Sequence, residues 1–145
     1  LLNAVAVFRA LGVARPKVAP LCAAETPTDA MPATRDAEAL AAMAAAGELE
    51  GCHVSGPLAL DGAISAEAAR AKGIDHPVAG EADVLLVPAI EVGNALAKAL
   101  NWFLRRPLAH VIVGARAPIL IPSRVEGPED KLYSIALGVR VASHG

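Results

Sequence analysis

A hydroxyl and a permanent cation stand side by side at Ser123 and Arg124, between an apolar run and a helical pattern. The run is "PILI" at residues 118–121, and Pro128 occupies the position at which the next helix would begin. Free N–H groups at a helix start attract anions, and a guanidinium donates two parallel hydrogen bonds to phosphate. The pattern therefore predicts a phosphate site, although a capping serine followed by a solvated arginine explains the same residues.

Asp130 lies in the first turn of that expected helix. A carboxylate at this position stabilises a helix through its dipole. It is also a candidate general base, because it would lie close to the predicted phosphate site. Both roles stay open for Asp130 on spacing alone.

Two further loops carry polar residues after expected strands, where ligands bind in open α/β sheets. Gly93 permits a close backbone approach, Asn94 either caps a helix or contacts a ligand, and Lys98 lies one turn later on the same side. Asp61 follows "SGPLAL" in the other loop, where a turn with an Asx cap is the simpler explanation. We predict these four residues as substrate-binding, with capping and a surface lysine as the alternative.

Apolar runs alternate with helical patterns along the chain, which predicts an α/β protein with helices on the faces of a sheet. The expected strands occupy residues 17–22, 52–54, 82–88, 108–114 and 118–121. Helices are expected from apolar stripes at residues 1–11, 95–103 and 132–139, the last in a helix that starts near Pro128. Two more helices are expected at residues 35–46 and 65–72, with Thr34 and Ser65 as N-caps, and Gly12, Gly47 and Gly73 act as stops. Pro20 indicates that the first strand is short or at an edge.

The composition argues against several classes of protein. Of the 145 residues, 54% are hydrophobic and only 3% aromatic, and the formal charge is −2. Because there is neither a basic stripe nor a set of aromatic platforms, we expect no nucleic-acid partner. No apolar run reaches the ~18 residues of a membrane span, and no basic leader occurs. We therefore expect a cytoplasmic protein with no membrane partner.

Cys22 and Cys52 are the two cysteines, and we expect free thiols rather than a disulfide. The four histidines form no HxxH or HExxH pair and no CxxC occurs, so we expect no metal site. The glycine patterns of dinucleotide-binding and P-loop proteins and the GxSxG elbow of hydrolases are absent too.

Six stretches, read in order, resemble the phosphate acyltransferases, the family of phosphate acetyl- and butyryltransferases. They are "MPATRDAEALAAM" (31–43), "GPLALDGAIS" (56–65), "EAARAKGI" (67–74), "VAGEADVLLVPAIEVGN" (78–94), "VIVGARAPILIPSR" (111–124) and "KLYSIAL" (131–137). The butyryltransferase branch is the most similar, and the resemblance covers nearly the whole chain.

The resemblance implies a three-layer α/β fold like that of isocitrate and isopropylmalate dehydrogenases, with two domains and a cleft between them. Residues 1–110 would form the second domain, and residues 111–145 would return to the first. The chain opens inside a helical pattern without a methionine, so we expect a fragment whose first domain would precede Leu1.

The same resemblance implies the reaction acyl-CoA + phosphate ⇌ acyl phosphate + CoA, without a metal or prosthetic group. Ser123 and Arg124 match a serine–arginine pair that lies in the family's cleft. Asp130 matches an aspartate proposed as the base for the thiol of coenzyme A in acetyltransferase members. Acyl-CoA and phosphate are then the expected partners, and we expect a homodimer or a higher homo-oligomer.

Two positions depart from the family's pattern, because Ser55 and Ala89 stand where aspartates are usual. A non-catalytic remnant of the fold therefore stays open as an alternative. An enzyme of the same fold that makes acyl phosphate from an acyl carrier protein is another. A dehydrogenase of this fold class would need a cluster of metal-binding aspartates, and the sequence offers none.

Overall fold

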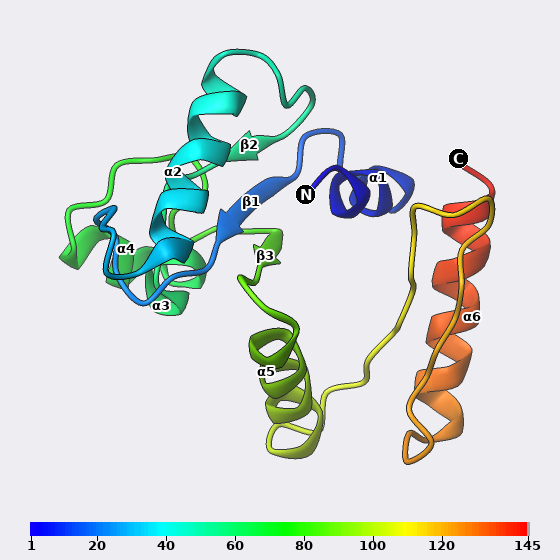
Figure 1. Ribbon diagram of the computed structural model, residues 1–145. Helices are drawn as coiled ribbons and strands as arrows, with labels where there is room; N and C mark the ends of the chain where they lie inside the picture. Colours follow the sequence, from blue (N-terminus) through cyan, green and yellow to red (C-terminus); the bar gives the residue numbers. More distant parts are fainter. Residues whose placement is uncertain (145) are drawn as a thin grey trace. The chain divides into compact units, whose positions relative to one another are not determined.

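The computed structural model describes residues 1–144, and the chain divides into two compact units. The first unit holds Leu1–Val5 and Ala14–Ala89, and the second holds Ala6–Val13 and the chain from Ile90 onward. The division falls inside helix α1 (Leu2–Ala10), so this helix contributes to both units. Figure 1 gives the order of the elements along the chain.

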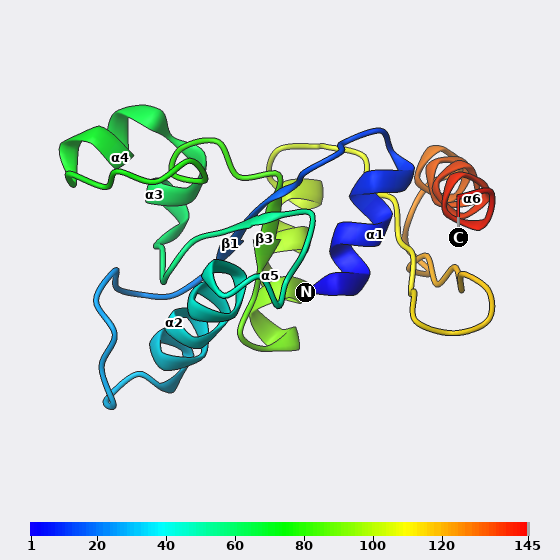
Figure 2. The same cartoon turned by 90° about the horizontal axis from the view of Figure 1, so that it is seen from above.

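A small parallel sheet forms the centre of the first unit. Its strands are β1 (Lys17–Pro20), β2 (His53–Val54) and β3 (Val84–Leu86), in the order β2-β1-β3. In the register, Val18 of β1 pairs with Val54 on one side and Val84 on the other. Figure 2 shows β1 and β3 next to each other. The predicted α/β class is confirmed.

Pro20 predicted a first strand that is short or at an edge. The strand is short, at four residues, and it is the central strand of the sheet. Pro20 is its last residue, and its carbonyl accepts a hydrogen bond from the backbone N–H of Leu58 at 3.2 Å. Proline has no N–H to donate, but its carbonyl still accepts a hydrogen bond. At the last residue of a strand, the loss of one donor weakens the sheet little.

Helices α2 (Pro32–Ala45), α3 (Leu60–Ile64) and α4 (Ala66–Ala71) complete the first unit. Its fully buried side chains are small and aliphatic, as the low aromatic content suggests. They include Val18, Ala19, Ala37, Ala63 and Val78, none more than 1% exposed. Small side chains let helices and strands approach closely, which suits a core this small.

The predicted helix ends of the first unit are partly confirmed. Ser65 is the N-cap of α4, because its Oγ accepts the backbone N–H of Ala68 at 3.2 Å. Gly73 follows α4 with a φ of +67°, a left-handed conformation that favours glycine. The Thr34 cap is wrong, because α2 begins two residues earlier at Pro32 and Met31 is its N-cap. Helix α3 was not predicted, because it is only five residues long.

The second unit contains helices α5 (Ile90–Trp102) and α6 (Pro128–Ala142), joined by an irregular segment. Strands were predicted at residues 108–114 and 118–121, and both predictions are wrong. The two runs meet only at one antiparallel bridge between Ile112 and Ile119, which are 49% and 47% exposed. An apolar run becomes a buried strand only when a sheet is present to pair with it, and the described part of this unit offers no such sheet.

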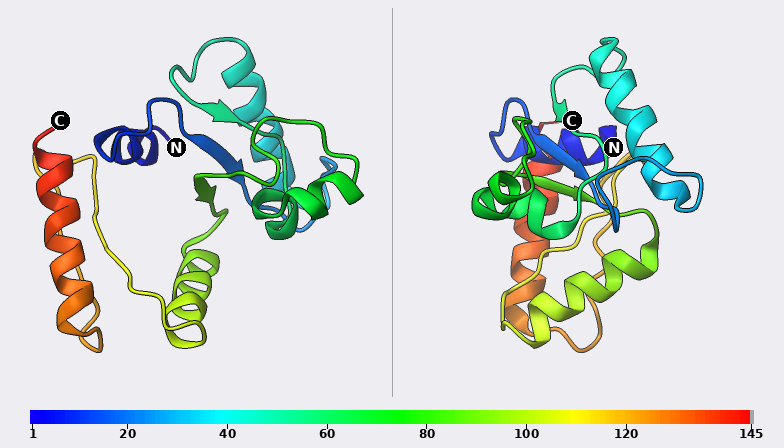
Figure 3. Two further views of the ribbon diagram at one scale, coloured as in Figure 1. Left: turned by 180° about the vertical axis from the view of Figure 1, so that it is seen from behind. Right: turned by 90° about the vertical axis from the view of Figure 1, so that its left-hand side faces the viewer.

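Helix α6 begins at Pro128 as predicted, and the segment before it runs back along the helix (Figures 1 and 3). The predicted apolar stripe has the right period, yet Leu132 and Val139 are each 63% exposed. The buried residues of α6 are Ser134 and Gly138 instead. Gly138 packs closely on Leu120: a Cβ added at position 138 would lie 2.8 Å from Cδ2 of the leucine side chain. Among residues 1–144, no helix combines the length and apolar character needed to cross a membrane.

Candidate functional site

A pocket of about 540 Å³ lies in the second unit and brings five of the seven predicted site residues together. These five are Gly93, Asn94, Lys98, Ser123 and Arg124. The rest of the lining consists of Ile90, Ala97, His110, Ile121 and Pro122. The volume is within the range of small-molecule sites, ~300–1,000 Å³. We call this space the Ser123 pocket.

Helix α5 supplies one side of the Ser123 pocket. Asn94 and Lys98 are four residues apart, so they project from the same face of the helix. The structure excludes the capping explanation for Asn94, because α5 begins four residues earlier at Ile90. The Asn94 amide is therefore a group on the pocket-facing side of a helix and not part of a helix end.

The loop of residues 122–127 supplies the other side, and the Glu126 side chain holds it in shape. Its Oε2 accepts the backbone N–H of Ser123 at 2.8 Å. The backbone N–H of Glu126 donates in turn to the Ser123 carbonyl at 3.1 Å. This reciprocal pair closes a tight turn. Arg124 is exposed within it, and among the described residues its guanidinium forms no ion pair.

Glu126 also connects the loop to two other segments. Its side chain is only 1% exposed, and its Oε1 lies 2.9 Å from Nε2 of His110 and 3.7 Å from Nζ of Lys98. The backbone N–H of His110 donates to Oγ of Ser134 on α6 at 2.9 Å. A buried carboxylate needs such partners, since an unpaired buried charge is strongly destabilising. Lys98, His110 and Ser123 therefore surround one carboxylate.

Sequence reasoning missed Glu126 and His110. Sixteen residues separate them, and His110 lies in a run that the apolar pattern assigned to a buried strand. The spacing of Glu126 three residues after Ser123, in a loop before a helix, was the available indication of a side chain that folds back on the backbone.

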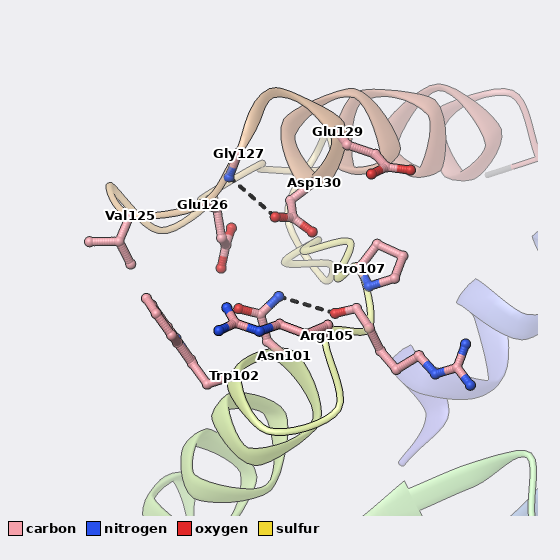
Figure 4. A pocket seen from close by; sticks show the side chains of 10 residues that line it. Asn101, Trp102, Arg105, Pro107, Val125, Glu126, Gly127, Glu129 and Asp130 are labelled. Carbon is pink, nitrogen blue, oxygen red and sulfur yellow. Dashed lines mark hydrogen bonds between the residues drawn. The ribbon is translucent and has the colours of Figure 1, made fainter.

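Asp130 does not line the Ser123 pocket. Its Oδ1 accepts the backbone N–H of Leu108 at 2.8 Å, and its Oδ2 accepts that of Gly127 at 3.3 Å. Figure 4 shows Asp130 in a second pocket of the same unit, about 240 Å³, and the dashed contact to Gly127. Both carboxylate oxygens are thus engaged in holding the start of α6 and the segment at Leu108. We call this space the Trp102 pocket.

Asp61 is the predicted site residue that belongs to the first unit. Its Oδ1 accepts hydrogen bonds from Nζ of Lys72 at 2.8 Å and from the backbone N–H of Gly62 at 2.8 Å. The Lys72 hydrogen bond, followed by the Gly62 one, holds the pKa of Asp61 below its usual value. The carboxylate is therefore a partner of Lys72 in this structure.

The two positions that depart from the family's pattern both lie in the first unit. Ser55 is 1% exposed, and its Oγ donates to the carbonyl of Gly56 at 2.9 Å. Ala89 is exposed. The serine hydroxyl thus has a backbone partner where a carboxylate would be expected.

Both cysteines are free, as predicted. Burial, and to a lesser degree the nearby Asp36, raises the pKa of the Cys22 thiol. A raised pKa lowers the fraction of thiolate, which is the nucleophilic form. Across residues 1–144, His, Cys, Asp and Glu form no group of three that could hold a metal ion.

The fold is α/β, and one of its pockets presents a guanidinium, an ammonium, a hydroxyl and an amide to the same volume. These groups suit an anionic substrate. The family model described as "Phosphate acetyl/butaryl transferase" matches residues 1–139. The chain therefore belongs to the phosphate acetyl/butyryl transferase family.

Individual relatives agree with this assignment. The chain is 53% identical, over 137 residues, to a "Probable phosphate butyryltransferase" of Bacillus subtilis. This match covers 94% of this chain and 46% of that protein. It is 45% identical to the "Phosphate butyryltransferase" of Clostridium acetobutylicum, over 98% of this chain and 47% of that protein. The chain thus spans about half the length of the curated relatives it matches.

A solved structure has a similar fold. It is a branched-chain phosphotransacylase from Enterococcus faecalis V583, with a TM-score of 0.87 and 37% sequence identity. The match covers 99% of this chain and 51% of that one.

Proposed function

We propose that the protein is a phosphate acyltransferase, which transfers an acetyl or butyryl group reversibly between coenzyme A and inorganic phosphate. The reaction is acyl-CoA + phosphate ⇌ acyl phosphate + CoA. The observation that carries the proposal is the Ser123 pocket, where Ser123, Arg124, Asn94 and Lys98 line one volume in a chain of this family.

Arg124 and Lys98 would bind the phosphate. The guanidinium of Arg124 is exposed and forms no ion pair with the residues described, so its donors are available to two phosphate oxygens. Lys98 adds a compact charge from α5, although it lies 3.7 Å from Oε1 of Glu126. A bound phosphate would therefore share Lys98 with Glu126.

Ser123 and Asn94 would act on the acyl group. Attack on the carbonyl carbon moves negative charge to the carbonyl oxygen, and a fixed donor near that oxygen lowers the barrier by ~2–4 kcal/mol. The Ser123 backbone is fixed by Glu126 at 2.8 Å, so its hydroxyl extends from a rigid turn. Holding both substrates in one pocket supplies a further part of the rate.

The transfer would be direct, without an acyl-enzyme and without a cofactor. Burial raises the pKa of Cys22, which disfavours it as a nucleophile at neutral pH. We assign neither cysteine a catalytic role. Coenzyme A and phosphate are substrates in this scheme, so the proposal includes no metal and no prosthetic group.

Asp130 as general base stays a prediction from the sequence. Its two carboxylate oxygens accept hydrogen bonds from the N–H groups of Leu108 and Gly127. If Asp130 exchanges the thiol proton, Asp130→Asn removes the limb of the pH–rate profile that ionisation of its carboxyl produces. If it only holds the start of α6, the profile keeps its shape and stability falls.

The wider architecture belongs to the same proposal. We propose a three-layer fold like that of isocitrate and isopropylmalate dehydrogenases, with residues 1–110 as a second domain and residues 111–145 returning to the first. A cytoplasmic homodimer or higher homo-oligomer completes it. The match to the phosphotransacylase at a TM-score of 0.87 supports the common fold with that protein.

The test measures release of the coenzyme A thiol from acetyl-CoA and butyryl-CoA by the natural full-length protein. We expect release that requires phosphate and produces acyl phosphate. Acyl groups carried on acyl carrier protein serve as the comparison donor. Turnover with the carrier protein alone would replace this proposal by the carrier-dependent reaction, and no turnover with any donor would leave a non-catalytic fold.

A further inference from the structure

His110 is a titratable side chain that lines the Ser123 pocket and has no part in the scheme above. Its side chain is 32% exposed, so the ring is partly accessible to a ligand. Its backbone N–H donates to Oγ of Ser134 at 2.9 Å, and Ser134 is itself 1% exposed on α6. The position of His110 beside Ser123 and Arg124 is therefore fixed by a buried contact.

Glu126 fixes the ring of His110. Oε1 of the 1% exposed carboxylate lies 2.9 Å from Nε2, while Oε2 accepts the Ser123 N–H. Nζ of Lys98 lies 3.7 Å from the same Oε1, at the distance of an ion pair. An ionised carboxylate only accepts hydrogen bonds, so beside it the neutral ring carries its hydrogen on Nε2. In that tautomer the lone pair is on Nδ1, which can accept a proton.

This arrangement is that of a histidine base oriented by a carboxylate, a pairing that recurs wherever a nucleophile has to lose a proton. We propose that His110 takes the proton of the coenzyme A thiol and returns it in the reverse direction, and that Glu126 is its positioning residue. This inference rests on the proposed function.

The step balances in both directions. When acyl phosphate reacts, the S–H proton moves to Nδ1 of His110, the sulfur bonds to the acyl carbon, and the C–O bond to phosphate breaks. In the reverse direction a phosphate oxygen bonds to the acyl carbon, the C–S bond breaks, and Nδ1 of His110 gives its proton to the departing thiolate. Arg124 stays bound to the phosphate oxygens throughout.

Asp130 is the competing base, and geometry favours His110. The two carboxylate oxygens of Asp130 accept backbone N–H groups, and Asp130 lines the Trp102 pocket. His110 lines the same pocket as Ser123 and Arg124. The charged side chains around His110 are Glu126, in contact, and Lys98 and Arg124, which line that pocket.

The experiment compares His110→Gln, His110→Ala and the matched control His144→Gln in the phosphate-dependent thiol-release assay. General acid–base catalysis contributes ~10²–10⁴-fold, so we expect kcat to fall at least about 100-fold in both His110 variants. The KM for phosphate should change little, because Arg124 remains. Added imidazole should restore part of the rate of His110→Ala, since the pocket has room for it. His144 is exposed near the end of α6, and its variant should keep the wild-type rate.

The possible outcomes distinguish failure of the His110 role from failure of the proposed function. If the natural protein shows no phosphate-dependent thiol release, both are overturned. If it is active but His110→Gln stays within about threefold of its kcat, only the role of His110 is overturned. The same holds if imidazole gives no rescue of a folded His110→Ala protein, or if Asp130→Asn alone removes the limb of the pH profile that ionisation of the base produces.

Glu126→Gln tests the positioning role separately. The amide can present its NH₂ group to His110 and no longer requires the hydrogen on Nε2. We expect a loss of kcat with an unchanged KM for phosphate, and a changed tautomer of His110 in the ring ¹⁵N NMR spectrum. An unchanged tautomer and an unchanged kcat would overturn the role of Glu126.

Discussion

The centres of the two units are held in different ways. In the first unit, β1 places Val18 and Ala19 in a core where both are 0% exposed. In the second unit, α5 has no buried residue, and the most buried charged side chain is Glu126, whose side chain is 1% exposed. Apolar packing is non-directional, whereas hydrogen bonds to a carboxylate fix both distance and angle. A pocket that has to aim individual groups at a substrate benefits from the second kind of support.

The polar residues predicted for chemistry, apart from Asp61 in the first unit, all lie in the second unit. Ser123, Arg124, Asn94 and Lys98 lie in the second unit around the Glu126 network. In the first unit, the polar Ser55 and Thr34 are 1% and 0% exposed and bind neighbouring backbone groups. Buried polar groups thus support the backbone in the first unit, and in the second they also hold an accessible site.

Arg124→Ala should give the largest effect on activity, and it tests most directly whether the second unit carries the site. Loss of the free guanidinium from the Ser123 pocket should lower kcat/KM for phosphate by at least about 100-fold, or roughly 2.7 kcal/mol. Steady-state kinetics with acetyl-CoA and butyryl-CoA measure it. Arg116→Ala, which removes an exposed arginine outside the pocket, is the control. Near-normal kinetics for Arg124→Ala would remove the second unit's pocket from the reaction.

Glu126→Ala should destabilise the second unit by about 2–3 kcal/mol, because a buried acceptor of charged and backbone donors is lost. Hydrogen exchange should show faster exchange at the backbone N–H of Ser123. Glu129→Ala is the matched control, since Glu129 is exposed and its Oε1 accepts the hydroxyl of Tyr133 at 3.0 Å. Equal effects of the two substitutions would contradict the carboxylate-centred description of this unit.

Val18→Ala tests how much apolar packing stabilises the first unit. Removing two methyl groups from a fully buried position should cost about 2 kcal/mol, from lost transfer energy and the cavity left behind. Denaturant unfolding followed by circular dichroism measures the loss. Val92→Ala, at a 43% exposed position on α5, should cost much less. The KM for phosphate should stay unchanged in Val18→Ala, and an increase would show that the first unit's core supports the phosphate site.

The smallest effect concerns acid stability. Hydrogen bonds from Lys72 hold the pKa values of Glu25 and Asp61 below their usual values. Carboxyls with lowered pKa values stabilise the folded state above their unfolded pKa, near pH 4, and lose that contribution as the pH falls through the folded value. Lys72→Met should therefore lower the free energy of unfolding slightly above about pH 5, and the difference should disappear in acid. The free energy of unfolding is measured against pH for the wild type, Lys72→Met and the control Lys131→Met. If the difference between Lys72→Met and the wild type is the same at every pH, this explanation is wrong.

The first unit was easier to predict from sequence than the second. Residues 17–22 and 82–88 are apolar runs that meet in one sheet, so their pattern reports real burial in β1 and β3. Residues 108–114 and 118–121 have the same pattern but only one bridge, between Ile112 and Ile119. Local pattern cannot reveal whether a partner strand exists, because pairing is a long-range property.

The site divides in a similar way. Ser123 and Arg124 were candidates because their types and the following helix start suggest anion binding, and Asn94 and Lys98 were candidates from helical spacing. The structure places all four in one pocket, and their roles stay predictions. The contact of Glu126 with His110 depends on how a sixteen-residue segment folds back, which no local rule gives. Asp130 was assigned to the chemistry by position, while its contacts to Leu108 and Gly127 appear only in three dimensions.

Trp102 offers a practical consequence of the second pocket. It is the single tryptophan of the chain, it is 49% exposed, and the guanidinium of Arg105 lies 5.9 Å from the centre of its ring. Tyrosine is also represented once, by Tyr133 of the second unit. Ultraviolet fluorescence of the unmodified protein therefore reports on the second unit alone. Its emission is a label-free optical signal with which to test whether phosphate or coenzyme A binds to the unit that carries the Ser123 pocket.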